Sequence, residues 1–220
     1  CGDNFSGGRL TELSVYKGDT YKLELEGGQT FFINCAIVAD YDLHEGGEMD
    51  AELLEKLQHA DKMRKAKKRA LYLLGSRMYS YNELYKKLLP TYGEEASRAA
   101  ADAMQEYGYI DDADYAGKLA EKLIHGKHYG MSKTRWEMQS RGLDKNLIED
   151  ILAEYTDDEI DEEIMRLLRT KYAEKLSDPD DRRRTVAALA RRGYSYGAVK
   201  RCIEAALADE EDFDPDEFEE

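Results

Sequence analysis

Three glycines recur about 50 residues apart, at Gly93, Gly142 and Gly193, and the residues that follow each of them match. Small or aliphatic residues stand six and ten positions after each glycine: Ala99, Ile148 and Val199, then Ala103, Leu152 and Ile203. Self-similarity at a fixed period marks a tandem repeat, because one small unit cannot bury enough apolar surface by itself. We therefore expect three units, each with a long, a short and a third helix, stacked into an elongated curved array.

The segment from Asp50 onward has a helical pattern. Apolar residues recur three and four positions apart, as at Ile160, Ile164 and Leu167, which places them on one face of a helix. Polar residues that can cap helix N-termini precede the apolar runs, at Asp50, Ser80, Asp111, Ser132, Asp144, Asp178 and Ser195.

The first unit departs from this pattern at its short helix. Ser80 and Glu83 form a capping box, in which the hydroxyl and the carboxylate bond to backbone N–H groups at the helix start. Pro90 lacks a backbone N–H and is expected to end this helix. A loop over Leu89–Tyr92 then leads to Gly93, so the match to the other units is weaker here.

Before Asp50 the apolar residues alternate with polar ones. Tyr21, Leu23 and Leu25 follow the period of two that is typical of a half-buried strand. Gly-Asp at 18–19 and Gly-Gly at 27–28 are turn dipeptides. We expect a small β-hairpin or meander over Leu10–Cys35 and a connection through Tyr41–Gly47. It is too small to be stable alone and is expected to pack on the following helix.

The predicted fold class is therefore mainly α, with tandem three-helix repeats behind a small β-rich N-terminal extension. The expected boundaries are a disordered leader or cloning remnant at 1–9, the β-rich extension at 10–49, helical repeats at 50–110, 111–156 and 157–208, and an acidic disordered tail at 209–220.

The net charge is −15, and nine acidic residues of the segment 209–220 contribute much of it. Such a charge opposes nonspecific binding to nucleic acid, which draws its affinity from basic side chains facing phosphates. No stretch approaches the ~20 apolar residues of a membrane span.

Three cysteines, widely separated, suggest free thiols in a reducing compartment, and no signal peptide is visible, so we expect a cytoplasmic protein. Because the chain opens with Cys1, we interpret it as a fragment or a processed chain. A mature lipoprotein, which also begins with cysteine, is the less favoured interpretation.

No set of residues has the spacing of a catalytic or metal site. His125 and His128 stand three apart, but Gly126 and Gly130 indicate a loop, and no carboxylate or cysteine close in sequence completes a ligand set. Phosphate-binding glycine motifs are absent from the sequence. We therefore expect no enzymatic activity, no metal and no cofactor. Trp136 is expected in the core, with a partner-binding anchor as the alternative.

Basic side chains gather in three clusters, one in each repeat. They lie at 62–69, at 133–141 and at 182–201. Solvated helix faces that balance an acidic chain are the simpler interpretation of any single cluster. Their recurrence favours one continuous surface for an acidic partner, a phosphate backbone or both.

Several segments resemble one family. Residues 70–84 read ALYLLGSRMYSYNEL, residues 108–116 read GYIDDADYA, and residues 191–199 read RRGYSYGAV. In order and spacing, from about Lys62 to Leu207, these segments and Arg141-Gly142 resemble the RecX family. Two features depart from the family pattern: Tyr79 stands where a second arginine is frequent, and the acidic tail is not shared.

The resemblance implies a monomeric regulator that docks into the groove of the RecA–DNA filament and limits strand exchange and coprotease activity in recombinational repair and the SOS response. It also implies contact with single- or double-stranded DNA through the filament. The rival hypotheses are an autonomous DNA-binding helical-repeat protein and an unrecognised enzyme. The candidate partner- or DNA-binding residues are Arg77, Lys65, Lys68, Lys133, Arg135, Arg141, Arg182, Arg183, Arg184, Arg191 and Arg192.

Overall fold

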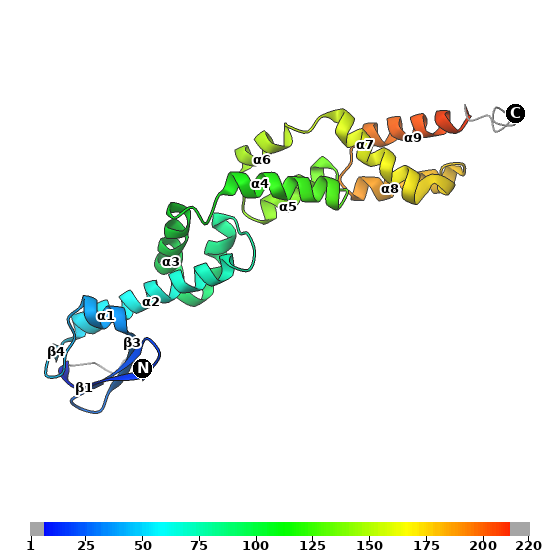
Figure 1. Cartoon of the computed structure of the whole chain (residues 1–220). Helices are drawn as coiled ribbons and strands as arrows, with labels where there is room; N and C mark the ends of the chain where they lie inside the picture. Colours follow the sequence, from blue (N-terminus) through cyan, green and yellow to red (C-terminus); the bar gives the residue numbers. More distant parts are fainter. Residues whose placement is uncertain (1–6, 212–220) are drawn as a thin grey trace, which may run out of the picture. The chain divides into compact units, whose positions relative to one another are not determined.

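The computed structural model describes residues 7–211, with side chains described as far as residue 208. The chain divides into two compact units (Figure 1). The first unit holds the described residues up to Arg77 together with Leu84–Tyr109, and the second holds Met78–Glu83 and the described residues from Ile110 onward. Helices follow a small N-terminal sheet in the described part, which confirms the predicted fold class.

The N-terminal extension is an antiparallel sheet with strand order β3-β2-β1-β4. Its strands are β1 (Gly8–Lys17), β2 (Thr20–Leu25), β3 (Thr30–Asn34) and β4 (Glu48–Met49). Leu23, Leu25 and Ile33 are buried in one cluster with Leu54 and Leu57 of the next helix. The sheet thus gains a core by packing on this helix, as its small size requires.

Two elements of the extension were not predicted, namely β4 and the short helix α1 (Cys35–Asp40), which Asn34 caps by accepting a hydrogen bond from the Ala36 N–H. The prediction of a disordered leader at 1–9 is wrong for its last two residues, because β1 begins at Gly8 and Arg9 pairs with Glu48 of β4. Residues 1–6 of that leader lie outside the described residues.

The first helical repeat consists of α2 (Ala51–Leu74) and α3 (Tyr81–Glu106). Asp50 caps α2, since its carboxylate accepts a hydrogen bond of 2.7 Å from the Leu53 N–H. Gly93 interrupts α3 with φ 74° and ψ 177°, so α3 contributes two successive helices.

The prediction that Pro90 ends the short helix is wrong. Pro90 lies inside α3, and the expected loop over Leu89–Tyr92 is helical. An interior proline removes one backbone hydrogen bond at a cost of ~3 kcal/mol. Burial of Leu84 and Leu88 on the same helix offsets that cost, and the break falls at Gly93 instead.

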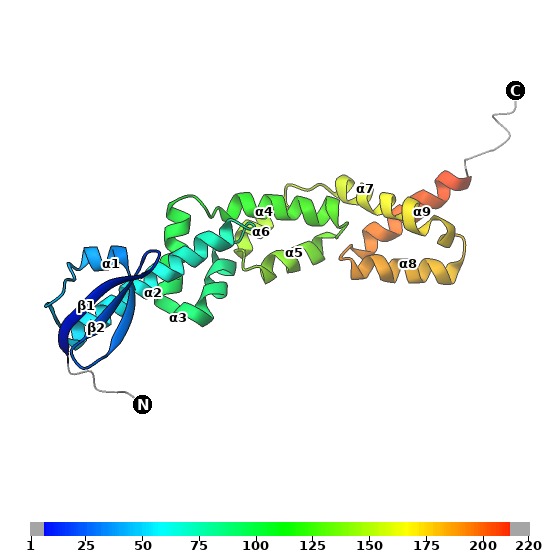
Figure 2. The ribbon, with the colours of Figure 1, turned by 60° about the horizontal axis from the view of Figure 1, so that its bottom comes forward.

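The second unit contains the other two helical repeats. The first of these has α4 (Asp112–Glu121), prolonged by a π-turn (Lys122–Gly126), then α5 (Met131–Ser140) and α6 (Lys145–Leu152). The second has α7 (Asp157–Leu167), prolonged by a π-turn (Leu168–Tyr172) and a 3-10 turn (Ala173–Lys175), then α8 (Pro179–Arg191) and α9 (Tyr196–Glu211). Within this unit α4 and α7 lie along one side, while α5 and α8 follow one another along the other (Figure 2).

Most of the predicted caps are present. Asp111, Asp144 and Asp178 each accept hydrogen bonds from two backbone N–H groups at a helix start. Ser132 is an exception, because α5 starts at Met131 with Gly130 as its cap residue. Gly130 lies against the backbone of Gly193, which leaves no room for a side chain and accounts for a glycine at the cap position.

The end of the last repeat also differs from the expectation. Helix α9 runs to Glu211, three residues into the segment 209–220 that was expected to be a disordered tail. The remainder of that tail, residues 212–220, lies outside the described residues. The two helical repeats of the second unit share one hydrophobic core, which includes Leu123, Met138, Ile148, Ile164 and Val199.

Candidate partner-binding surface

The first basic cluster lies along α2, where Lys65 and Lys68 are exposed. The Lys65 ammonium pairs with the carboxylate of Asp61 one turn earlier. Lys68 lines a groove of about 640 Å³ between α1 and α2, and exposed Arg77 follows the end of α2. The Lys65 side chain is 62% exposed although that of Asp61 is only 14% exposed, so the lysine of this pair remains open to solvent.

The second basic cluster is largely engaged inside the protein. The Arg135 guanidinium donates to both carboxylate oxygens of Glu149, at 2.7 and 2.9 Å, and so ties α5 to α6. This hydrogen bonding lowers the pKa of Glu149. The Lys133 ammonium lies 4.2 Å from the centre of the Tyr129 ring. Arg135 thus holds two helices together, and Lys133, which is also half-buried, lies over an aromatic ring.

The third basic cluster lies on α8. Arg183 and Arg184 are exposed and pair with Asp180 and Asp181 of the same helix, at 3.6 and 2.8 Å. Arg191 is exposed in the last turn of α8. These cations sit where a partner can reach them, because pairs within one helix and open to water are weak.

Two of the predicted binding residues instead join neighbouring repeats. The Arg192 guanidinium donates to the carbonyl oxygens of Lys127 and His128, at 3.0 and 3.3 Å. The backbone carbonyls of Arg192 and Gly193 in turn accept hydrogen bonds from the N–H groups of Gly130 and Ser132. The turn between α8 and α9 therefore docks on the start of α5.

The same arrangement occurs one repeat earlier. The Ser80 hydroxyl donates to the Arg141 carbonyl oxygen at 2.5 Å, and the Asn82 amide donates to the Gly142 carbonyl oxygen at 2.7 Å. Arg141 also donates to the Tyr115 hydroxyl at 3.0 Å. In both cases the Arg-Gly dipeptide lies in the turn after the second helix of one repeat. That turn docks on the start of the second helix of the preceding repeat.

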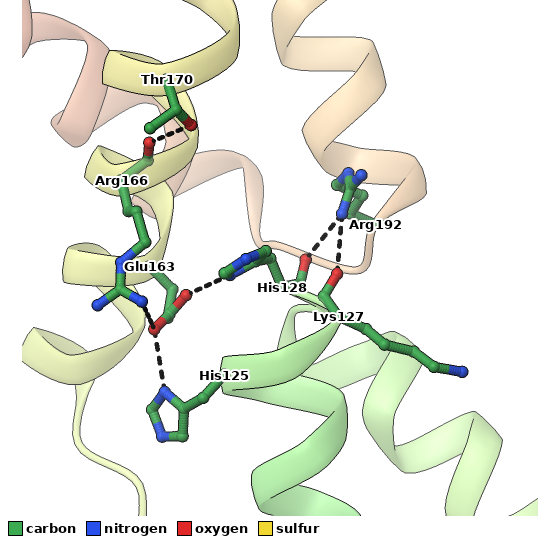
Figure 3. A network of polar contacts seen from close by, with 7 residues as sticks. All are labelled: His125, Lys127, His128, Glu163, Arg166, Thr170 and Arg192. Carbon is green, nitrogen blue, oxygen red and sulfur yellow. Dashed lines mark hydrogen bonds and ion pairs between the residues drawn. The ribbon is translucent and has the colours of Figure 1, made fainter.

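A buried carboxylate joins the last two repeats, and the sequence did not predict it. Glu163 of α7 is 2% exposed, and its two oxygens lie 3.0 Å from the His125 Nδ1 and 2.6 Å from the His128 Nδ1 (Figure 3). The Arg166 guanidinium lies 3.6 Å from the same carboxylate. No carboxylate lies close to these histidines in the sequence, and the fold brings one to them from 38 and 35 positions away.

Opposing effects set the pKa of Glu163. Burial raises it, but the hydrogen bonds from His125 and His128 and the charge of Arg166 outweigh burial and leave the pKa below its ordinary value of 4.5. Glu163 is therefore ionised at neutral pH. One sequence signal could have revealed it: Glu163 stands three residues after Ile160 on an otherwise apolar face.

Trp136 does not lie in the core as expected. Its side chain is 62% exposed on α5, where Thr134 and Met138 face inward instead. Tyr196 at the start of α9 is also exposed, at 68%. By contrast Tyr79, which stands where the RecX pattern often has an arginine, is buried.

The described residues contain no helix long and apolar enough to cross a membrane. Nor do they place three or more histidine, cysteine or acidic side chains together in a way that could hold a metal ion. What they offer is a set of exposed cations on α2 and α8, the half-buried Lys133 on α5, and exposed aromatic side chains on α5 and α9, which is the chemistry of a binding surface.

Comparisons with known proteins show which family the chain resembles. A family model described as the third three-helix domain of RecX matches residues 157–203, which span α7 to α9. "Regulatory protein RecX" of Leuconostoc citreum (strain KM20) is 28% identical over 211 residues, covering 91% of this chain and 77% of the relative. "Regulatory protein RecX" of Clostridium botulinum (strain Alaska E43 / Type E3) is 25% identical over 206 residues, covering 90% of this chain and 96% of the relative.

Two solved structures share the fold. One is described as a crystal structure of regulatory protein RecX, with a TM-score of 0.68 and 21% identity, covering 88% of this chain and 99% of that chain. The other is RecX from Lactobacillus salivarius, with a TM-score of 0.62 and 21% identity, covering 68% of this chain and 99% of that chain.

Proposed function

The chain belongs to the RecX family of regulatory proteins, and from that premise we propose that it binds the RecA–DNA filament and inhibits recombinase and coprotease activity in recombinational repair and the SOS response. The observation that carries the proposal is the similarity to proteins named RecX along 91% of the chain. Segments such as 108–116, with their helix cap at Asp111, fall within that similarity.

In this proposal the protein acts by binding and not by chemistry. The exposed cations are the groups that would meet DNA phosphates or an acidic surface of RecA. Among the predicted residues, Lys65, Lys68, Arg183, Arg184 and Arg191 are exposed on helix surfaces. Lys133 is half-buried beside Tyr129.

Arg135, Arg141 and Arg192 are proposed to act indirectly. The guanidinium of each donates hydrogen bonds to an acceptor within the chain. These acceptors are, in order, the Glu149 carboxylate, the Tyr115 hydroxyl and two backbone carbonyls. Replacing any of them would loosen the packing between helices or between repeats. Binding to a partner would be weakened only through that loosening. Their loss should therefore lower stability as well as binding.

The test is the ATPase and strand-exchange activity of RecA on single-stranded DNA with this protein added. We expect inhibition at equal or lower molar dose. The variant Arg184→Glu/Arg191→Glu should inhibit less, because it reverses two exposed charges on α8. Lys86→Glu/Lys87→Glu, a matched reversal of two exposed lysines on α3, should inhibit as the unaltered chain does.

No inhibition by the unaltered chain at equal dose would overturn the proposal. Tight binding to DNA without RecA, with a steep decline in affinity as salt rises, would favour the autonomous DNA-binding alternative. The net charge of −15 counts against that alternative, because it opposes the approach of a polyanion.

A further inference from the structure

A groove of about 520 Å³ lies between α8 and α9, within the range of ~300–1,000 Å³ typical of binding pockets. The helices are joined by a short turn, so the start of α8 lies beside the end of α9 (Figure 1). Val186 of α8 and Ile203 and Leu207 of α9 supply apolar lining. The groove therefore offers an apolar floor to a side chain from outside.

The rim of this groove is basic. Arg183 of α8 and Lys200 of α9 both line it. Each is exposed and, among the described residues, forms a loose pair within its own helix, 3.6 Å from Asp180 and 3.6 Å from Glu204 respectively. Such pairs are weak, so both cations can turn to an incoming carboxylate. A ligand matched to this groove combines an apolar or aromatic group with negative charge.

The chain itself carries a segment of that chemistry directly after α9. Residues 212–220 read DFDPDEFEE, with six acidic residues and two phenylalanines, Phe213 and Phe218. Leu207, which lines the groove, stands four residues before the last residue of α9. Nine residues span up to ~30 Å when extended, enough to fold back over a groove that begins one helical turn away.

We infer that the groove between α8 and α9 binds the chain's own segment 212–220. A phenylalanine ring occupies the floor formed by Val186, Ile203 and Leu207, and neighbouring carboxylates face Arg183 and Lys200. The tether supplies an effective concentration on the order of millimolar, so an intrinsic Kd on the order of 0.1 mM is sufficient to keep the groove mostly occupied. Residues 1–6, the other segment outside the described residues, hold one acidic residue and lack this charge match.

The occupied groove has a consequence that does not depend on RecA. The segment screens Arg183 and Lys200 from any anionic partner, so a partner that uses these cations has to displace it. The inference holds or fails independently of the proposed function, because the contact lies within one chain and can be measured without RecA.

The test replaces Phe218 of the full chain by the photoreactive analogue p-benzoylphenylalanine, which keeps an aromatic ring at this position. After irradiation, mass spectrometry locates the cross-linked residues. We expect cross-links within one chain to peptides containing Val186, Ile203 or Leu207. Their yield should be independent of protein concentration and should fall at least about fivefold in 1 M salt, where the Debye length is ~3 Å.

Paired variants of the full chain sharpen the test. Arg183→Glu/Lys200→Glu reverses the rim and should abolish the cross-links, whereas Lys86→Glu/Lys87→Glu reverses two exposed lysines of α3 and should leave them unchanged. Circular dichroism confirms that both variants are folded. Cross-links only between separate chains, or only to peptides outside α8 and α9, would overturn the inference. So would an unchanged yield in the rim variant.

Discussion

Gly193 adopts a φ of 90°, and a Cβ built at this position would lie 2.4 Å from the backbone nitrogen of Lys133. Opposite it, a Cβ at Gly130 would lie 2.4 Å from the Gly193 carbonyl. Two effects therefore exclude a side chain at Gly193. Its left-handed backbone conformation disfavours one, and the contact between the two backbones leaves no room for one. The glycine that marks the repeat in the sequence is therefore also required at the joint between repeats.

The first prediction follows from this contact. We expect Gly193→Ala to lower the free energy of unfolding by ~2–4 kcal/mol, since strain at positive φ adds to displaced backbone. Gly117→Ala is the matched control, because Gly117 lies in α4 with nothing within 4 Å of its added Cβ. It should raise stability by ~0.5–1 kcal/mol through helix propensity. Chemical denaturation followed by circular dichroism measures both, and equal effects would contradict the steric argument.

The second prediction concerns Glu163. Replacing Glu163 by glutamine removes the charge that His125, His128 and Arg166 face, while keeping the size of the side chain. We expect a loss of ~1–3 kcal/mol at pH 7, the usual cost of disrupting a buried charge-assisted network. Glu162→Gln, on the exposed side of the same helix, should change stability by less than ~0.5 kcal/mol.

The pH dependence of this effect has a definite sign. The pKa of Glu163 is lower in the folded chain than its ordinary value of 4.5, so its contribution to stability is full above that value and is lost as the pH falls through the folded pKa. The stability difference between the unaltered chain and Glu163→Gln should therefore shrink as the pH falls below about 4.5. A difference that stays constant from pH 6 to about pH 3 would show that charge is not responsible.

At the scale of elements, α5 shows why one helix face was misassigned. Thr134 and Met138 stand one turn apart and are fully buried, whereas Trp136 lies about 200° around the helix from Thr134. Apolar residues are few in this short helix, so its pattern alone does not fix the inward face. The contact of Gly130 with the turn after α8 helps to set it, and that contact joins residues 62 or more positions apart.

The third prediction tests this orientation. Trp136→Ala should cost less than ~1 kcal/mol of stability because the indole is largely in water, whereas Met138→Ala should cost ~2–5 kcal/mol because it opens a cavity. Thermal unfolding of the two variants provides the measurement. A larger loss from Trp136→Ala than from Met138→Ala would reverse the assignment of faces.

Local signals predicted much of the fold, and contacts between distant residues account for what they missed. Caps such as Asp111 and the breaks at Gly93, Gly142 and Gly193 depend on residues close in sequence. The roles of Arg192 and Glu163 depend on partners 64 and 35 residues away. The sequence predicted a binding role for all of the basic candidate residues. In the structure some of them are exposed cations, whereas others hold helices or repeats together.

At the scale of the whole molecule, the charges of the chain are segregated along the sequence. Nine acidic residues crowd into 209–220, while exposed basic residues recur on helices of successive repeats. If the repeats each contact a partner filament, their charges should contribute separately, since sites without shared neighbours add in free energy. If binding is confined to one repeat, reversing the charges of another should have no effect.

The last prediction separates these two cases. Lys65→Glu/Lys68→Glu in the first repeat and Arg184→Glu/Arg191→Glu in the third should each weaken binding to RecA filaments by about 1 kcal/mol, or roughly fivefold in Kd. The combined variant should show the sum, about 2 kcal/mol or roughly thirtyfold, because the two pairs lie in different compact units and share no partner. Anisotropy of labelled single-stranded DNA coated with RecA gives the affinities, with Lys86→Glu/Lys87→Glu as the reference for reversed charge alone. A combined effect no larger than that of one pair would confine the filament contact to a single repeat.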